Sequence, residues 1–197
     1  MTRAFLLASL TLLGGCISLL PEPPPPPALY VLEAQGVQPL PGAPIDAVVA
    51  VAEPTGERAI LGADLIWRTG DSIAYVGQTQ WSSRASEALQ QTLLETLLRQ
   101  GRFRSAARAG EAQAEYQIRW EVLDFEVREE TMTARFVADV RLVARGRQIL
   151  AQRIVSAEAP VAGRSSALAA NALARAAREG SARIGEFAAE AAASAGR

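Results

Sequence analysis

The sequence feature that most constrains the fold is a block of prolines near the N-terminus. Six of the seven residues at positions 21–27 are proline. Such a run favours a polyproline helix, which rises about 3.1 Å per residue, so the segment is predicted to be a stiff spacer of about 20 Å. The folded part of the chain is therefore expected to begin after it.

The residues before the spacer have the pattern of a bacterial export signal. Arg3 supplies a positive charge, residues 4–13 form an apolar run, and two glycines then stand directly before Cys16, the only cysteine. A charged start, an apolar run of roughly 7–15 residues and a small-residue cleavage site define a secretory signal. The run is shorter than the roughly 20 apolar residues of a membrane-spanning helix. Residues 1–15 are therefore predicted to be a signal peptide.

The segment Leu13-Gly14-Gly15-Cys16 resembles the lipobox of bacterial lipoproteins, in which the signal is cut before an acylated cysteine. The alternative is an ordinary signal peptide with a chance cysteine. Each buried CH₂ contributes about 0.8 kcal/mol, so two or three acyl chains such as palmitate hold a protein firmly. Cys16 is predicted to be the lipidation site, and residues 16–28 the lipidated tether. Ile17, in place of aspartate, implies by the same resemblance sorting to the outer membrane of a Gram-negative bacterium.

The composition excludes several classes of site. The chain has no histidine and no lysine, and all 20 of its basic residues are arginine. Ser-His-Asp and Cys-His sites need an imidazole, the usual zinc ligands are absent from a mature chain with a lipidated cysteine, and a GxxxxGK[ST] loop needs a lysine. Loss of Arg3 takes the net charge from −1 to −2, which gives no broad electrostatic reason to bind nucleic acid. We expect no catalytic residues, no metal and no cofactor, and therefore no enzyme.

Two charged segments nevertheless invite a functional interpretation. Asp124, Glu126, Glu129 and Glu130 surround Arg128, and a carboxylate pair can in principle cleave glycosides. Solvated charges beside a turn are the favoured interpretation of this cluster. Arginines are also concentrated in residues 101–108, where a solvated loop is favoured over a lipid-headgroup or partner site.

The pattern along the chain predicts seven strands. A two-residue apolar period or a short apolar run marks each of them. They cover residues 28–33, 45–52, 64–68, 72–76, 116–127, 133–144 and 148–156. Thr69-Gly70-Asp71 is expected to join the third and fourth strands as a hairpin, because glycine beside aspartate is a hairpin signal. The apolar phase shifts near residues 122–124, which predicts a β-bulge.

Two segments have a helical period. In residues 82–100 leucines recur every four residues, with Ser82 or Ser83 as the expected N-cap and Gly101 ending the helix. Residues 165–193 are predicted to form an alanine-rich helix that Gly180 and Gly185 weaken locally. The order of elements indicates an α+β fold: one domain (residues 29–194) with a mostly antiparallel β-sheet and two amphipathic helices packed on one face.

Three aromatic residues lie near the predicted hairpin. Trp67 and Tyr75 are expected to pair across it, and Trp81 stands just before the first helix. Burial in the core is the favoured interpretation of these side chains. The alternative is that they anchor an interface with a partner, because aromatic residues are enriched at interface hot spots.

Several segments together resemble the ABC-type transport auxiliary lipoproteins, which accompany MCE-domain lipid transport systems, including the paraquat-inducible type. These segments are YVLEAQG, VVAVAEP, ILGADLIWRTGDSIAYVGQTQWSSRASEALQQTLLETLLRQGRF and a late strand pair. The family's aliphatic-aromatic-Arg strand falls on Ile66-Trp67-Arg68, and its Tyr-containing strand and following Trp fall on Tyr75 and Trp81.

The resemblance implies a non-catalytic, outer-membrane-anchored lipoprotein in the periplasm. It would bind the periplasmic MCE-domain protein of an ABC system that transports lipid or another hydrophobic solute, and a homo-oligomer would be compatible. One alternative is a pilotin-like lipoprotein that chaperones an outer-membrane protein. Another is a lipid-carrying protein with its own cavity.

Overall fold

The computed structural model describes residues 25–196, which form one domain of nine strands and three α-helices. The strands are β1 (Ala28–Tyr30), β2 (Ile45–Val51), β3 (Thr55–Gly56), β4 (Asp64–Thr69), β5 (Ser72–Trp81), β6 (Phe103–Arg108), β7 (Tyr116–Arg128), β8 (Thr133–Ala144) and β9 (Ile149–Pro160). The helices are α1 (Arg58–Leu61), α2 (Ala85–Gln100) and α3 (Ser166–Ala195), with a 3₁₀ turn η1 (Arg145–Arg147) before β9. The predicted signal peptide and Cys16 fall outside the described residues.

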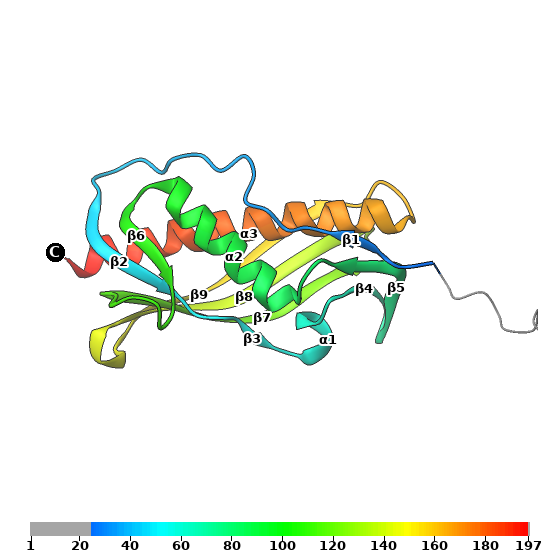
Figure 1. The fold of residues 1–197 in the computed structure, drawn as a ribbon, viewed down its shortest axis with the longest axis horizontal. Helices are drawn as coiled ribbons and strands as arrows, with labels where there is room; N and C mark the ends of the chain where they lie inside the picture. The colour runs from blue at the N-terminus through cyan, green and yellow to red at the C-terminus, as the bar shows by residue number, and fades with distance from the viewer. Residues whose placement is uncertain (1–24, 197) are drawn as a thin grey trace, which may run out of the picture.

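Strand β7 organises the sheet (Figure 1). One edge of β7 pairs with β8 along its whole length, and β8 pairs with β9, both antiparallel. The other edge of β7 meets β2, β3 and β4 one after another, all parallel to it. Strand β6 extends the sheet from β2, while β5 and then β1 extend it from β4. The predicted bulge is confirmed between Val122 and Asp124, where the register of β7 on β8 shifts.

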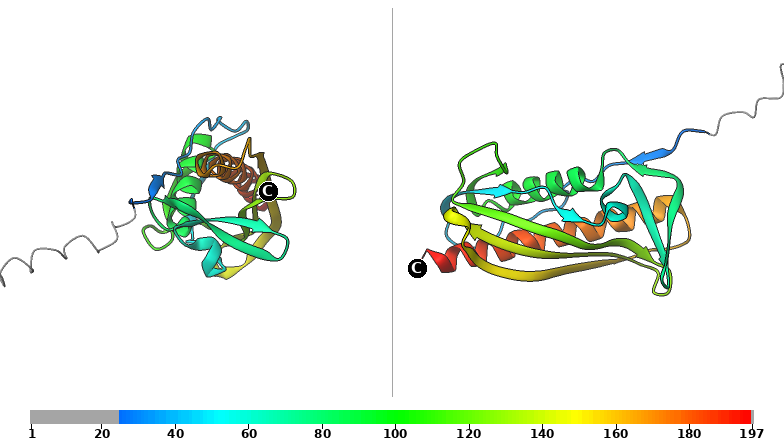
Figure 2. Two further views of the ribbon diagram at one scale, coloured as in Figure 1. Left: turned by 90° about the vertical axis from the view of Figure 1, so that its right-hand side faces the viewer. Right: turned by 90° about the horizontal axis from the view of Figure 1, so that it is seen from below.

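Helices α2 and α3 pack on one face of the sheet and on each other. Seen end-on, the sheet curves around α3 (Figure 2). The predicted α+β class and single domain are therefore confirmed. Three strand pairings are antiparallel and five are parallel, so the sheet is mixed. Sequence period marks a strand without revealing the direction of its neighbour.

Helix α2 starts three residues later than expected. Its N-cap is Arg84, without a side-chain cap. The backbone N–H of Ser82 donates to the carbonyl of Tyr30 at the end of β1, at 2.8 Å, so Ser82 still belongs to the edge of the sheet. The predicted serine cap is thus wrong. The end is confirmed: Gly101 adopts a left-handed conformation (φ 66°), and its N–H donates to Leu97. The leucines of α2 do not all face the core: Leu93 is fully buried, whereas Leu98 is exposed.

The two glycines of α3 are sites of close approach. A Cβ at Gly180 would overlap the ring of Phe136 on β8, and a Cβ at Gly185 would overlap the side-chain amide of Gln100 on α2. That amide donates from Nε2 to the carbonyl of Ala182 at 2.9 Å, which ties α2 to α3. The glycines lower intrinsic helix propensity, as expected, but they also permit the packing of α3.

Residues 103–108 form a strand rather than the expected solvated loop. Strand β6 pairs in parallel with β2, and Phe103 is buried against the edge of the Tyr116 ring. The segment has a single large apolar side chain, so its local pattern does not indicate a strand. Strand β3 and helix α1, each of four residues or fewer, were likewise not predicted. Within the described part of the chain no helix is long and apolar enough to cross a membrane.

Candidate interaction surface

The β4–β5 hairpin lies at the end of the molecule where the chain enters the fold (Figure 1). Gly70 and Asp71 form its two-residue turn, as the sequence predicts, and Gly70 takes a left-handed φ of 57°. Beyond the turn, the side chains of Ile73 and Tyr75 are 44% and 58% exposed. The hairpin therefore presents apolar surface to solvent, which is a common property of binding sites.

The three aromatic residues do not form one exposed surface. Tyr75 lies opposite Ile66 in the ladder, and Trp67 lies opposite Ala74, so the expected Trp67–Tyr75 pair does not form. Trp67 is half-buried against the core. Trp81 is 3% exposed and stacks on Phe125, with ring centroids 5.6 Å apart. Trp81 is therefore a core residue and unavailable to a partner, which leaves Tyr75 as the exposed aromatic of the three.

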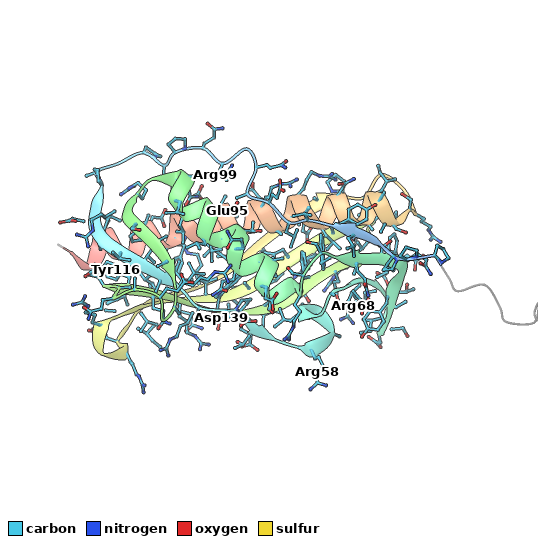
Figure 3. The ribbon with its side chains drawn as sticks, viewed as in Figure 1. Arg58, Arg68, Glu95, Arg99, Tyr116 and Asp139 are labelled. Atoms are coloured by element: carbon cyan, nitrogen blue, oxygen red, sulfur yellow. The ribbon has the colours of Figure 1, made fainter. Side chains whose placement is uncertain are left out.

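A buried carboxylate holds β4 to β7. Glu126 is fully buried, and its Oε1 accepts from Nε of Arg68 at 2.6 Å (Figure 3 labels Arg68). This bond raises the pKa of Arg68, against the opposing effect of desolvation. Nε of Arg128 lies 3.4 Å from the same oxygen. The expectation of a solvated acid cluster is therefore wrong for Glu126, because arginines from two strands cover it.

The turn after β7 holds the tip of the hairpin. Glu129 accepts from the hydroxyl of Thr69, and Glu130 accepts from the backbone N–H of Gly70. The Gly70 N–H lowers the pKa of Glu130 below its usual range. Arg164, from the loop before α3, pairs with Glu129 at 2.6 Å. The hairpin is thus fastened by carboxylates that belong to one short segment of the chain.

The remaining charges of this region are paired with one another. Asp124 lies 3.0 Å from Nε of Arg135 and 3.5 Å from Arg128. Each carboxylate of the predicted cluster thereby contacts an arginine or a hydrogen-bond donor in the hairpin turn. This arrangement holds neighbouring strands together. No group of His, Cys, Asp or Glu in residues 25–196 has an arrangement suited to a metal ion.

Two surface hollows of about 500 and 490 Å³ flank the C-terminal part of α3. Charged side chains line both of them: Arg102, Glu186 and Glu190 in the first, and Arg153 and Glu190 in the second. Neither is a closed apolar chamber of the kind expected for a domain that carries lipid inside it.

The fold places the protein in a class of α+β domains already seen in bacterial proteins. The crystal structure of protein XCC0632 from Xanthomonas campestris, a DUF330 protein, is similar with a TM-score of 0.78 and 18% identity, over 86% of this chain and 99% of that one. An uncharacterized protein (TM-score 0.67, 14% identity, 83% and 99% covered) and hypothetical protein CT253 from Chlamydia trachomatis (0.52, 11%, 76% and 99%) share the fold. No curated protein matches the chain.

The family is established by sequence. The model of the ABC-type transport auxiliary lipoprotein component matches residues 30–185, and the chain belongs to that family. The resemblance noted in its strand and helix motifs is thus confirmed. The matched residues run from the end of β1 into the second half of α3 and include the whole hairpin.

Proposed function

We propose that this protein is an outer-membrane-anchored periplasmic lipoprotein that serves an ABC transport system for lipids or other hydrophobic solutes. In this role it binds the MCE-domain protein of the system and performs no chemistry itself. The observation that carries the proposal is the family match over residues 30–185, since the family is defined as an auxiliary component of ABC-type transport.

The chemistry of the described residues supports a binding role. The chain contains no histidine and no lysine, and its only cysteine lies in the lipobox-like segment. The most deeply buried carboxylate, Glu126, is bonded to Arg68 and is enclosed in the sheet. A general acid or base has to reach the atom whose proton it transfers, so a carboxylate in this position fits a structural role.

The proposed contact surface is the exposed part of the β4–β5 hairpin. Of the aromatic residues expected there, Tyr75 remains with 58% exposure, and Ile73 joins it at 44%. Trp67, opposite Ala74 in the ladder, is half-buried against the core. Large apolar and aromatic side chains that stand exposed on a rigid element are typical anchors of a protein–protein interface.

A capture experiment tests the proposal. The full-length lipidated protein, with an affinity tag after α3, is solubilised in detergent and mixed with the MCE-domain protein encoded beside it. We expect the MCE protein to be retained, and Tyr75→Ala to weaken its retention. Ile154→Ala is the matched control, because Ile154 is 66% exposed on β9, away from the hairpin. Circular dichroism of both variants should remain native.

Failure of the wild-type protein to retain the MCE protein, even at high concentration, would contradict the proposal. Retention of a secretin or another outer-membrane barrel protein instead would favour the pilotin-like alternative. If Tyr75→Ala and Ile154→Ala reduce retention of the MCE protein equally, the MCE protein is still the partner, but the contact does not lie on the hairpin.

A further inference from the structure

Most of strand β5 has a free edge. Strand β5 (Ser72–Trp81) pairs with β4 through residues 72–75 and Gln80, and the register shifts between these two parts, where Gln78 has a positive φ of 56°. On the other side of β5, β1 covers only Thr79, Gln80 and Trp81. The remaining residues, 72–78, have no strand beside them within the described part of the chain. The regular part of this free edge of β5, residues 72–75, is about 13 Å long at about 3.3 Å per residue.

The register shows which backbone groups face outward along this edge. In a hairpin with a two-residue turn the closing pair, here Thr69 and Ser72, is hydrogen-bonded. Bonded and non-bonded pairs then alternate, so Ile73 and Tyr75 direct their N–H and C=O groups away from β4. The residues with exposed apolar side chains are therefore the same residues that offer unpaired backbone groups.

Parts of the other edges of the sheet are protected. Along β9, the carbonyls of Ser156 and Pro160 accept from Arg183 and Arg175 of α3, at 2.6 and 2.7 Å. Strand β6 carries Arg104 and Arg108, and β1 is only three residues long. Proteins protect strand edges in these ways because an open edge pairs with other chains. By contrast, residues 72–78 contain no charge and no proline.

The chain's own N-terminal segment is poorly suited to cover the free edge. Strand β1 runs parallel to β5 with Ala28 opposite Thr79, so continuing that register would place residues 21–27 beside residues 72–78. Six of those seven residues are proline. Proline has no N–H to donate to a ladder and is excluded from paired positions.

A lipid surface is equally unsuited. The hydrocarbon region of a membrane cannot satisfy backbone N–H and C=O groups, and each such group left unpaired costs several kcal/mol. The partner that matches alternating donors and acceptors, with apolar side chains between them and no charge, is an extended polypeptide of similar composition.

We propose that the free edge of β5 binds an extended, uncharged segment of the MCE-domain partner by β-strand addition. This inference rests on the proposed function and specifies how the contact is made. The partner's segment becomes a further strand beside residues 72–75, its backbone pairs with Ile73 and Tyr75, and its alternate apolar side chains pack against theirs.

The test separates backbone pairing from side-chain contact at one position. Tyr75→Ala removes the ring but keeps the N–H, whereas Tyr75→Pro removes both. Since the N–H points away from β4, proline should be tolerated by the hairpin. In the capture experiment with the full-length protein we expect Tyr75→Pro to bind at least about tenfold more weakly than Tyr75→Ala, because a buried carbonyl of the partner loses its donor.

Hydrogen exchange of the wild-type complex gives a second readout that needs no variant. Adding the MCE protein should slow exchange of the Ile73 and Tyr75 amides. If Tyr75→Ala and Tyr75→Pro capture the MCE protein with equal affinity, and the two amides gain no protection, the edge proposal is overturned. The proposed function would still stand. Absence of capture by the wild type would overturn the proposed function and, with it, this assignment of the partner.

Two further outcomes would assign the edge to another occupant. Protection of both amides that rises with the concentration of the lipoprotein alone would identify a second copy of this chain. Protection by vesicles of phosphatidylethanolamine and phosphatidylglycerol, without the MCE protein, would identify the membrane. Either result would overturn the proposal of strand addition by the MCE partner.

Discussion

Gly180 on α3 lies directly against the ring of Phe136 on β8, so closely that a Cβ at position 180 would overlap that ring. Phe136 is fully buried and contacts Phe125 and Trp120, with ring centroids 6.3 and 6.4 Å apart. The missing side chain of Gly180 therefore lets α3 approach the aromatic core of the sheet. A residue that is unfavourable for the helix is thus required by its packing.

Gly180→Ala should destabilise the domain despite the better helix propensity of alanine. Forcing a methyl group into a filled core typically costs about 1–3 kcal/mol, against a gain of up to about 1 kcal/mol from propensity. We expect a lower denaturant midpoint in urea unfolding. Gly77→Ala is the control, because a Cβ there meets open space, and its midpoint should stay within about 0.5 kcal/mol of wild type.

If the overlap with Phe136 causes the loss, Phe136→Leu combined with Gly180→Ala should be less destabilised than the sum of the two single variants. Neighbouring residues that share one space show such coupling. An unchanged midpoint for Gly180→Ala alone would mean that α3 can shift away from β8 without cost.

Arg68→Ala should be far more damaging than loss of a typical surface arginine. It removes the closest partner of the fully buried Glu126, and breaking a buried ion pair costs about 3–5 kcal/mol. We expect about 3 kcal/mol in urea unfolding, because Arg128 stays near the carboxylate. Arg99→Ala breaks an exposed pair with Glu95 on α2 and should cost about 0.3–0.5 kcal/mol. Similar losses in the two variants would show that Glu126 does not depend on Arg68.

The fastening of the hairpin should weaken in acid. The pKa of Glu130 is lowered by the Gly70 N–H, so its contribution is fully present above the unfolded pKa of about 4.3 and is lost as the pH falls through the lower folded value. Exchange of the Gly70 amide, corrected for its intrinsic pH dependence, should therefore accelerate below about pH 4.3. Glu130→Gln should flatten that change, whereas Glu121→Gln, at an exposed position of β7, should not. If the pH profile of Gly70 exchange is identical in all three proteins, Glu130 does not cause the weakening of the hairpin in acid.

Cys16→Ser should abolish the lipid anchor without affecting the fold. The variant should no longer incorporate an alkyne-labelled fatty acid and should leave the membrane fraction, while its circular dichroism matches that of the wild-type domain. The physical reason is that the acyl chains supply the membrane affinity. Continued labelling and membrane fractionation of Cys16→Ser would show that the lipobox interpretation is wrong.

Much of the fold follows from local patterns. The alternation of residues 133–144 defines β8 with the bounds that the structure has, and the phase shift near residue 123 locates the bulge of β7. The left-handed cap at Gly101 and the turn at Gly70-Asp71 are also readable, because glycine serves backbone conformations that other residues adopt at a cost. These features depend on residues close together in sequence, and so does the motif resemblance that placed the chain in its family.

Other features were decided only by tertiary structure. Strand β6 pairs with β2, and the backbone of Ser82 is held to Tyr30 of β1, two residues before the N-cap of α2. The burial of Glu126 depends on Arg68, which is 58 residues away in sequence. A periodic pattern shows which side chains share a face, but it does not show what covers that face.

Some features of the interaction surface were also predictable from the sequence, and others depended on the tertiary structure. The sequence by itself identified the hairpin and its aromatic residues, because turn chemistry and side-chain type are local properties. Only the tertiary structure showed that Trp81 stacks in the core while Tyr75 stays exposed, and that β1 begins too late to cover residues 72–78 of β5. Exposure and a free strand edge depend on which distant segments pack nearby, so they arise only when the whole chain is folded.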